Sequence, residues 1–192
     1  MGIITAYIKE GEIVMKLKDE KGFTLIEVIV VAGIIAILAS ILVPMVLKEI
    51  DESRITKVQA DVRSIATAIV VFKKDTAQWP VMDNACAANV TLLTGDGNLP
   101  PNLAGMGYDT SVTSSYNDHL AADTNTCYNN WKGAYMTRVT ADPWGNSYIT
   151  NASDFSITSN PVWIISAGAN GQIETPPFSV TLLGDDIGFR LK

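Results

Sequence analysis

The apolar residues of this chain are concentrated near its N-terminus. Residues 28–47 form an uninterrupted run of 20 residues without a charged side chain. As an α-helix with a rise of ~1.5 Å per residue, such a run is ~30 Å long, which matches the hydrocarbon core of a bilayer. A core helix of a soluble protein is rarely apolar on every face. The run therefore predicts a membrane-spanning helix.

The pattern becomes amphipathic after Leu47. Apolar residues recur every three to five positions with charged residues between them, which predicts a helix that lays one apolar stripe on a globular domain. We expect residues 48–79 to continue the helix and end it near Pro80, because proline disfavours helical backbone in the residue before it. A coiled coil is the alternative, although the period is not sustained over enough heptads. The stripe consists of Ile50, Ile55, Val58, Val62, Ile65, Ile69 and Phe72.

Polar residues and short strand-like runs fill the rest of the chain. Residues 80–132 are rich in Asn, Asp, Thr, Ser and Gly, which predicts a loop-rich insert. Residues 133–192 alternate apolar runs with turn sequences, which predicts a small antiparallel sheet packed on the helix, an α+β fold. The expected strands are residues 133–139, 147–150, 155–157, 162–166 and 178–182.

The chain has two cysteines, Cys86 and Cys127, and both follow the apolar run. If this part of the chain is exported, a disulfide is expected between them. It would close a loop of ~42 residues, and loop closure of that size stabilises a fold by up to about 4 kcal/mol. Two buried free thiols are the alternative.

Glu27 stands at the N-terminal border of the apolar run. A carboxylate at this position is costly unless a cation neutralises it. No basic residue lies within helical reach on its C-terminal side. A cut before Phe23 would supply one, because the new α-amino group of the same or a neighbouring subunit can pair with Glu27. Alternatively, Glu27 reaches the lipid headgroups, where the helix dipole favours it slightly.

Residues 22–27 read GFTLIE and precede the apolar run. This arrangement resembles the type IV prepilin signature. The resemblance implies that a membrane prepilin peptidase cleaves between Gly22 and Phe23 and that Phe23 becomes N-methylated. It also implies that Glu27 registers subunits during assembly and that Pro44 kinks the helix.

The resemblance divides the N-terminal region into two parts. Residues 1–22 become a cleaved leader, which starts at Met1 or Met15, and residues 23–47 become the transmembrane helix and filament core. An ordinary secretory signal peptide is the alternative, but the apolar run is too long and no small-residue cleavage site follows it. Three lysines, Lys16, Lys18 and Lys21, lie shortly before the run, and two basic residues follow it closely, so the N-terminus is expected in the cytoplasm. The implied location is the inner membrane, crossed once, with a periplasmic or extracellular C-terminal domain.

Residues 142–148 read DPWGNSY and resemble the D-P-W-G-x-x-Y segment of the major pseudopilin of type II secretion. A second likeness lies in the stretch SAGANG at residues 166–171 and in the later stretch GDDI. These resemble the C-terminal loop of that family, which binds a structural Ca²⁺.

The resemblance implies that Asp185 and Asp186 are calcium ligands. Asn170 stands where the family often has Asp, so it supplies less charge. Carboxylates, a side-chain amide and a Gly-rich loop offer the hard oxygen ligands that Ca²⁺ prefers. A solvated acidic turn is the alternative.

Composition argues against two other classes of function. With 14 basic and 20 acidic residues the net charge is −6, which disfavours nucleic acid as the main partner. His119, the sole histidine, lies in a polar stretch and is expected to be solvated, without the Ser, Cys or carboxylate pattern of a catalytic triad. No phosphate-binding motif is present. We therefore expect a protein that is not an enzyme.

Three hypotheses of function follow. The first is a structural subunit of the pseudopilus, which spans the periplasm and drives protein export by type II secretion. The second is a subunit of a surface type IV pilus that serves adhesion, motility or DNA uptake. The third is a membrane-anchored binding module that does not polymerise. The first two imply self-association and contacts with prepilin peptidase, an inner-membrane assembly platform and minor pilins or pseudopilins. Residues 142–148 and Asp185–Asp186 favour the first.

Overall fold

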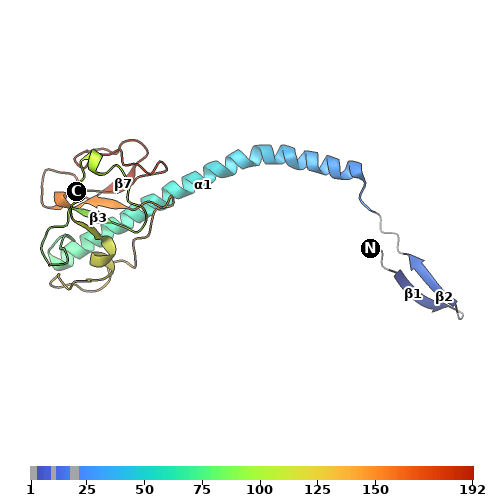
Figure 1. Cartoon of the computed structure of the whole chain (residues 1–192), viewed down its shortest axis with the longest axis horizontal. Coiled ribbons are helices and arrows are strands. Elements are labelled where there is room, and N and C mark those ends of the chain that lie inside the picture. Colours follow the sequence, from blue (N-terminus) through green and yellow to red (C-terminus); the bar gives the residue numbers. More distant parts are fainter. Residues whose placement is uncertain (1–3, 10–11, 18–21) are drawn as a thin grey trace. The chain divides into compact units, whose positions relative to one another are not determined.

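A computed structural model describes residues 4–9, 12–17 and 22–192. The chain divides into two compact units, Met1–Glu49 and Ile50–Lys192. In the first unit, strands β1 (Ile4–Lys9) and β2 (Glu12–Leu17) form an antiparallel hairpin. The hairpin lies inside the predicted leader, where the sequence suggested no strand (Figure 1).

Helix α1 (Leu25–Thr76) is 52 residues long and begins in the first unit and ends in the second. It is continuous through Pro44, so the kink expected there stays a prediction. The helix ends three residues before the predicted position. The following residue, Ala77, has a φ of 59°, and a residue in this left-handed conformation stops a helix.

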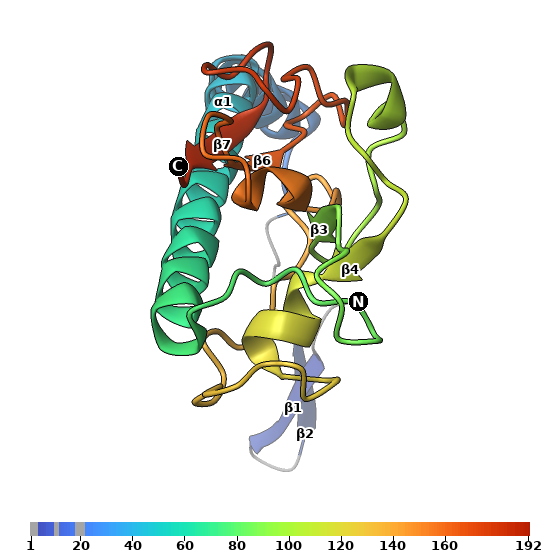
Figure 2. The same cartoon turned by 90° about the vertical axis from the view of Figure 1, so that its left-hand side faces the viewer.

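The second unit contains a five-stranded sheet with the order β4-β3-β5-β6-β7. Strand β3 is parallel to β4, and the other neighbouring pairs are antiparallel. Helix α1 runs beside this sheet, which confirms the predicted α+β fold (Figure 2). The strands are β3 (Leu92–Thr94), β4 (Thr113–Ser115), β5 (Ile149–Asn151), β6 (Trp163–Ser166) and β7 (Ile187–Arg190).

The main core lies between α1 and the rest of the second unit. The predicted stripe is buried from Val58 onward, and Phe72 at its far end is fully covered. The expectation was wrong for Ile50 and Ile55, which are 43% and 39% exposed. The stripe therefore begins about two turns later than the periodicity suggested. The side chains that enclose it include Leu93, Tyr116, Leu120, Tyr148, Phe155, Val162 and Ile164.

Two predicted strands exist and three do not. Residues 162–166 correspond to β6, and residues 147–150 correspond to β5 with a shift of one or two positions. Residues 133–139, 155–157 and 178–182 contain no strand.

Each missing strand has a local cause. In the first of these segments, Tyr135 packs against the core while its backbone N–H bonds to Leu120 rather than to a ladder. The 3₁₀-helix η3 (Ala152–Phe155) occupies the start of the second. Pro176 and Pro177 precede the third, and β7 forms instead in the sequence after it.

The insert at residues 80–132 is more ordered than its composition suggested. It supplies β3 and β4, so the sheet does not begin at residue 133. Leu92 and Leu93 of β3 are completely buried. The insert also holds the 3₁₀-helix η1 (Ala104–Met106) and the π-helix η2 (Asn117–Ala121).

Candidate processing and assembly site

The region of the predicted cut leads directly into helix α1. Residues 22–24 have no regular secondary structure and are exposed. The Thr24 Oγ1 atom accepts a hydrogen bond from the backbone N–H of Glu27 at 3.3 Å. This is the geometry of a helix N-cap, which satisfies one of the unpaired N–H groups of the first turn. Sequence reasoning missed Thr24, although the spacing Thr-x-x-Glu before an apolar run is a known N-terminal signal.

The carboxylate of Glu27 lies in the first turn of α1. Among the described residues, neither an ion pair nor a hydrogen bond reaches this carboxylate. The structure thus places Gly22, Phe23 and Glu27 within the same short stretch of backbone. It leaves the acid available for a cation from outside the described part of the subunit.

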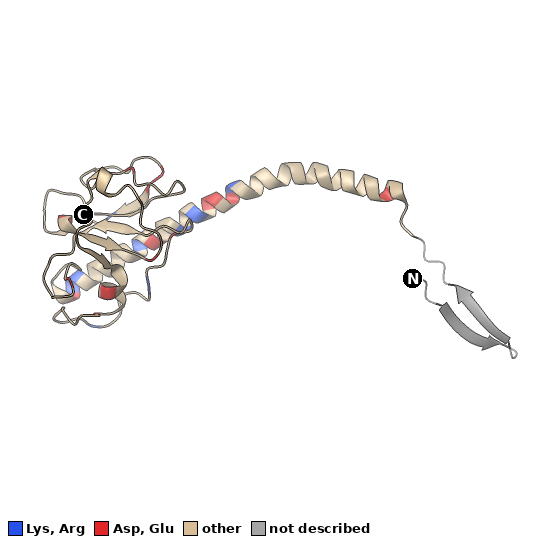
Figure 3. Cartoon of the chain, in the orientation of Figure 1, with Lys and Arg blue, Asp and Glu red and all other residues tan. Residues whose placement is uncertain are grey.

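The first half of α1 exposes its apolar residues on every side. Phe23 and Leu25 are 83% and 78% exposed, and exposure continues to Leu47 at 57%. In Figure 3 this part of the helix is almost free of charged residues, whereas the following turns carry several. In the described part of the chain, α1 is the one helix long and apolar enough to cross a membrane, and its most apolar 18-residue window has no buried residue. So large an apolar surface requires lipid or other apolar helices.

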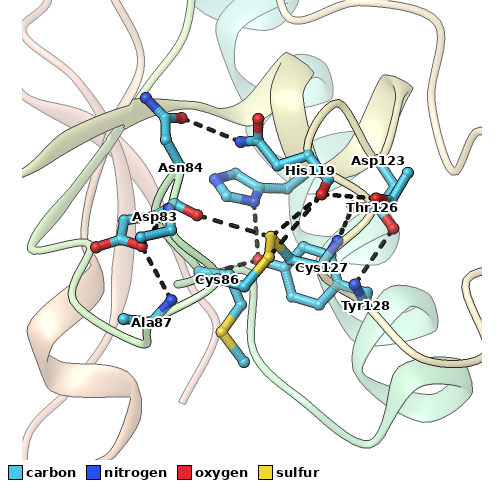
Figure 4. The surroundings of a disulfide bond; sticks show 12 residues. Asp83, Asn84, Cys86, Ala87, His119, Asp123, Thr126, Cys127 and Tyr128 are labelled. Carbon is cyan, nitrogen blue, oxygen red and sulfur yellow. Dashed lines mark hydrogen bonds between the residues drawn. A yellow bond between two sulfur atoms is a disulfide. The ribbon is translucent and has the colours of Figure 1, made fainter.

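The disulfide expected between Cys86 and Cys127 is present, so the alternative of free thiols is wrong. It joins two loops of the insert whose backbones are already unusual, since Cys86 and Thr126 have positive φ values of 59° and 53°. Asp83 accepts backbone hydrogen bonds from residues 85 and 87 in the first loop. The disulfide therefore clamps two tightly turned segments (Figure 4).

His119 contacts Tyr128, the residue after Cys127 of this disulfide. Its side chain is buried, contrary to the expectation of a solvated side chain. Its Nδ1 atom lies 2.8 Å from the hydroxyl of Tyr128 (Figure 4). Its Nε2 atom lies 2.9 Å from the hydroxyl of Ser114. Burial lowers the pKa of His119 to about 4. The ring is therefore neutral at physiological pH, and both nitrogens are used in packing the insert.

The DPWG segment forms a tight turn around Asp142. The Oδ1 atom of this carboxylate accepts backbone hydrogen bonds from Trp144 and Asn146 at 3.0 and 2.8 Å. Its Oδ2 atom accepts a hydrogen bond from the hydroxyl of Ser166 on β6. Gly145 has a φ of 90°, which favours glycine. The motif is thus a structural turn that fixes β5 against β6.

The predicted calcium residues lie in one part of the C-terminal region but face different partners. The Oδ2 atom of Asp185 accepts a hydrogen bond from the backbone N–H of Asn170 at 3.0 Å. The Oδ2 atom of Asp186 instead accepts backbone N–H groups of Glu174 and Thr175 at 2.9 and 2.7 Å. Sequence reasoning missed Glu174, whose Oε2 atom accepts the backbone N–H of Asp185 at 2.9 Å.

The donor atoms of this region fit a hard cation in their chemistry. The Oδ1 atoms of Asp185 and Asp186 are buried and have no hydrogen-bond partner. Burial and the neighbouring carboxylate of Glu174 raise the pKa of Asp186. No three His, Cys, Asp or Glu side chains of the described residues converge as a ready metal centre. The two unpartnered carboxylate oxygens of Asp185 and Asp186 are therefore the oxygen ligands that this region offers to such an ion.

Comparison with known proteins gives matches to the N-terminal helix region and to the folded domain. Residues 17–43 match the model of the prokaryotic N-terminal methylation motif, and residues 113–180 match that of type II secretion system protein G. The chain is similar to the type II secretion system core protein G of Pseudomonas aeruginosa, with 30% identity over 82% of this chain and 89% of the relative. The chain belongs to the type II secretion system protein G family.

Other members of the protein G family give the same picture. The core protein G of Escherichia coli strain K12 is 29% identical over 81% of this chain and 86% of its own length. That of Vibrio cholerae serotype O1 is 30% identical over 69% and 71% of the two chains. No solved structure matches the chain. The methylation motif covers Gly22, Phe23 and Glu27, and the protein G match covers Asn170 but ends before Asp185.

Proposed function

We propose that this chain is the main structural subunit of a type II secretion pseudopilus, anchored in the membrane before it is assembled. The observation that carries the proposal is the exposed apolar half of α1 with an unpaired carboxylate at its start. Lipid covers this surface in the free subunit, and the helices of other subunits cover it in a filament. A folded domain on the same helix is then displayed outside the core.

Processing prepares this helix for assembly. A prepilin peptidase removes the leader between Gly22 and Phe23, and Phe23 is methylated on its new amine. Two features support the cut at this site: residues 22–24 are exposed and irregular, and Thr24 caps the helix from the mature side. The cut therefore creates a positive charge next to an already formed helix start.

Assembly brings that amine close to Glu27 of a neighbouring subunit. In a low dielectric the attraction between these two charges is strong, whereas either charge alone is costly. A subunit in the wrong register buries an unpaired acid, so the pair selects the correct register. The partners of this step are an inner-membrane assembly platform and minor pseudopilins. The C-terminal domain lies in the periplasm and the helix crosses the inner membrane once.

Secretion is favoured over a surface pilus by the residues of the exported domain. The DPWGxxY sequence has a structural role in this domain. Its Asp142 organises a tight turn, and the hydroxyl of its Tyr148 donates a hydrogen bond to Asp61 on α1. The matched relatives are named as type II secretion proteins, and this chain is similar to them over most of their length.

A bound Ca²⁺ would complete the C-terminal region. Asp185 and Asp186 would hold the ion through their unpartnered oxygens, while Glu174 is positioned by its bond to the Asp185 backbone. The ion would neutralise clustered acids and join the loop at residue 170 to the segment before β7. Asn170 would contribute through its backbone contact with Asp185 rather than through its side-chain oxygen, which already accepts the N–H of Gln172.

Two measurements on the full chain test the function. Intact-mass analysis in cells with a working peptidase should show loss of residues 1–22 and one added methyl group. Glu27→Ala should keep the mature protein in the membrane and abolish filaments, while Glu27→Asp, which preserves the charge, should retain part of the yield. Filaments at the wild-type yield from Glu27→Ala would contradict the pairing, and a leader retained on the protein would contradict the processing.

A further inference from the structure

An apolar groove crosses the surface of the second unit between α1 and β7. Its walls are Ala66, Val70 and Val71 of the helix and Phe189 and Leu191 at the end of the chain. The groove encloses about 440 Å³. Val70 is 52% exposed and Phe189 is 38% exposed, so the groove is open along its length.

An apolar protrusion lies on the same unit, at residues 176–183. The segment reads PPFSVTLL and contains no charged residue. Phe178 and Val180 are 68% and 64% exposed, which is unusual for large apolar side chains on a folded domain. We call this segment the apolar loop.

The apolar loop is held rigidly although its tip is exposed. The indole N–H of Trp163 donates to the backbone oxygen of Ser179 at 2.8 Å, and the N–H of Leu183 donates to Thr175 Oγ1 at 2.9 Å. Two prolines restrict its first residues further. A pre-organised loop loses little entropy when it binds, so Phe178 is presented as an anchor.

The loop and the groove do not fill one another within a subunit. Leu182 of the loop lies beside Gln59 and Val62, at the start of the buried part of α1. The groove adjoins this site at Arg63 and Phe189 and extends to Val71. The nine residues from Val62 to Val71 span about 13.5 Å along a helix. The two surfaces are thus displaced along the helix axis.

We infer that the apolar loop of one subunit docks into the groove of the next subunit in the filament. This inference rests on the proposed pseudopilus function. A contact between two different surfaces is heterologous, and such a contact builds an open helical filament when its rotation does not close a ring. Charge is complementary as well, since the acidic Glu174 lies two residues before the loop and the basic Arg63 lines the groove. The occupant is a second copy of this chain.

Paired cysteines test the contact in filaments of the full chain. Phe178→Cys and Val70→Cys are placed in one chain, and a short bis-maleimide is added to sheared filaments. The native cysteines are joined in a disulfide and do not react. We expect a ladder of covalent multimers from the double variant and monomer from each single variant. Filaments of normal yield without a ladder would overturn the inference and leave the proposed function standing.

A second variant tests how much filament yield depends on the contact. Phe178→Ser should reduce filament yield at least about tenfold, because a buried aromatic anchor dominates an interface. Leu99→Ser, which alters a residue 44% exposed and outside both surfaces, should leave the yield unchanged. Both variants should keep the wild-type melting temperature and be processed normally. A normal yield from Phe178→Ser would contradict the docking.

Two other occupants give different results. If an apolar helix of a neighbour fills the groove, Val70→Cys links to Ile41→Cys rather than to Phe178→Cys. If lipid covers the loop, an environment-sensitive dye on Phe178→Cys reports an apolar setting in the assembly-defective Glu27→Ala background. Either result would overturn the inference. Absence of filaments from the wild-type chain would instead count against the proposed function.

Discussion

The hydroxyl of Tyr148 donates a hydrogen bond to the Oδ2 atom of Asp61 at 2.8 Å, joining the turn before β5 to helix α1 across 87 positions of sequence. The same oxygen accepts Lys57 Nζ at 3.1 Å. Tyr148 is 1% exposed, so its ring packs in the core while its hydroxyl reaches the partly exposed acid. This hydrogen bond thus links the start of β5 to α1 at the edge of the core, in addition to the apolar packing between them.

Removal of this contact should weaken the second unit. Tyr148→Phe keeps the ring and deletes the hydroxyl, and we expect a loss of about 1 kcal/mol in the free energy of unfolding because Asp61 keeps Lys57 and solvent. Chemical denaturation of the full chain in detergent measures it. Tyr135→Phe is the matched control, since its hydroxyl accepts one long bond of 3.3 Å from an exposed backbone N–H. An equal loss in both variants would contradict the assigned role of Asp61.

Acid should destabilise the insert through His119. Its pKa is about 4 in the folded chain because of burial, against about 6.5 when unfolded. Between these values the unfolded state binds more protons, so stability falls as the pH drops from about 6.5 to 4, by up to about 3 kcal/mol. The nearby carboxylates of Asp118 and Asp123 partly oppose this shift. Measurement of the free energy of unfolding at a series of pH values gives the slope of stability against pH.

A comparison with His119→Gln isolates that group. The variant retains hydrogen-bonding capacity but does not titrate, so its stability should vary less with pH over the same interval. The variant is expected to be less stable than wild type at pH 7.5, which does not affect the test because the slopes are compared. Identical slopes would show that the pH dependence arises from other groups.

Loss of the disulfide should cost more than any of these changes. Cys86→Ser with Cys127→Ser removes a link with a sequence separation of 41 residues. The loop-entropy model gives an upper value of about 4 kcal/mol for a loop of this size. Wild type treated with a reductant should reach the same melting temperature as the double variant. If the double variant is as stable as the oxidised wild type, the hydrogen bonds of Asp83 and His119 hold the two loops together without the disulfide.

Calcium removal should lower the melting temperature of the full chain. At a free ion concentration one hundred times the dissociation constant, binding stabilises the folded state by about 2.7 kcal/mol. EGTA should remove this contribution, and Asp185→Asn or Asp186→Asn should make the protein insensitive to EGTA. Glu49→Gln, an exposed acid on α1, is the control and should respond like wild type. No response of wild type to EGTA would refute the calcium proposal.

The parts of the fold predicted from sequence are those with strong local signals. The apolar run and the stripe from Val58 to Phe72 repeat over many turns, so α1 was predicted nearly to its last residue. The disulfide followed from having two cysteines in a segment expected to be exported. Both signals are independent of which distant segments pair.

The strands were harder to predict because they are short and their pairing is non-local. Strand β3 has three residues and lies between β4 and β5, which come from distant parts of the chain. Residues 178–182 look like a strand in composition but have no neighbour to pair with. In the same way, burial of His119 and the position of Glu174 depend on tertiary packing that no local pattern encodes.

The N-cap at Thr24 has a consequence for the order of events at the membrane. The hydroxyl that starts the helix belongs to the second residue after the proposed cut, so the helix does not depend on the leader for its first turn. The proposed cut would replace a neutral peptide bond by a positively charged ammonium group at the N-terminal end of the helix, without requiring the backbone to refold. Under the proposed function, the helix of the subunit would therefore be complete before cleavage, and a single hydrolysis would supply the charge needed for assembly.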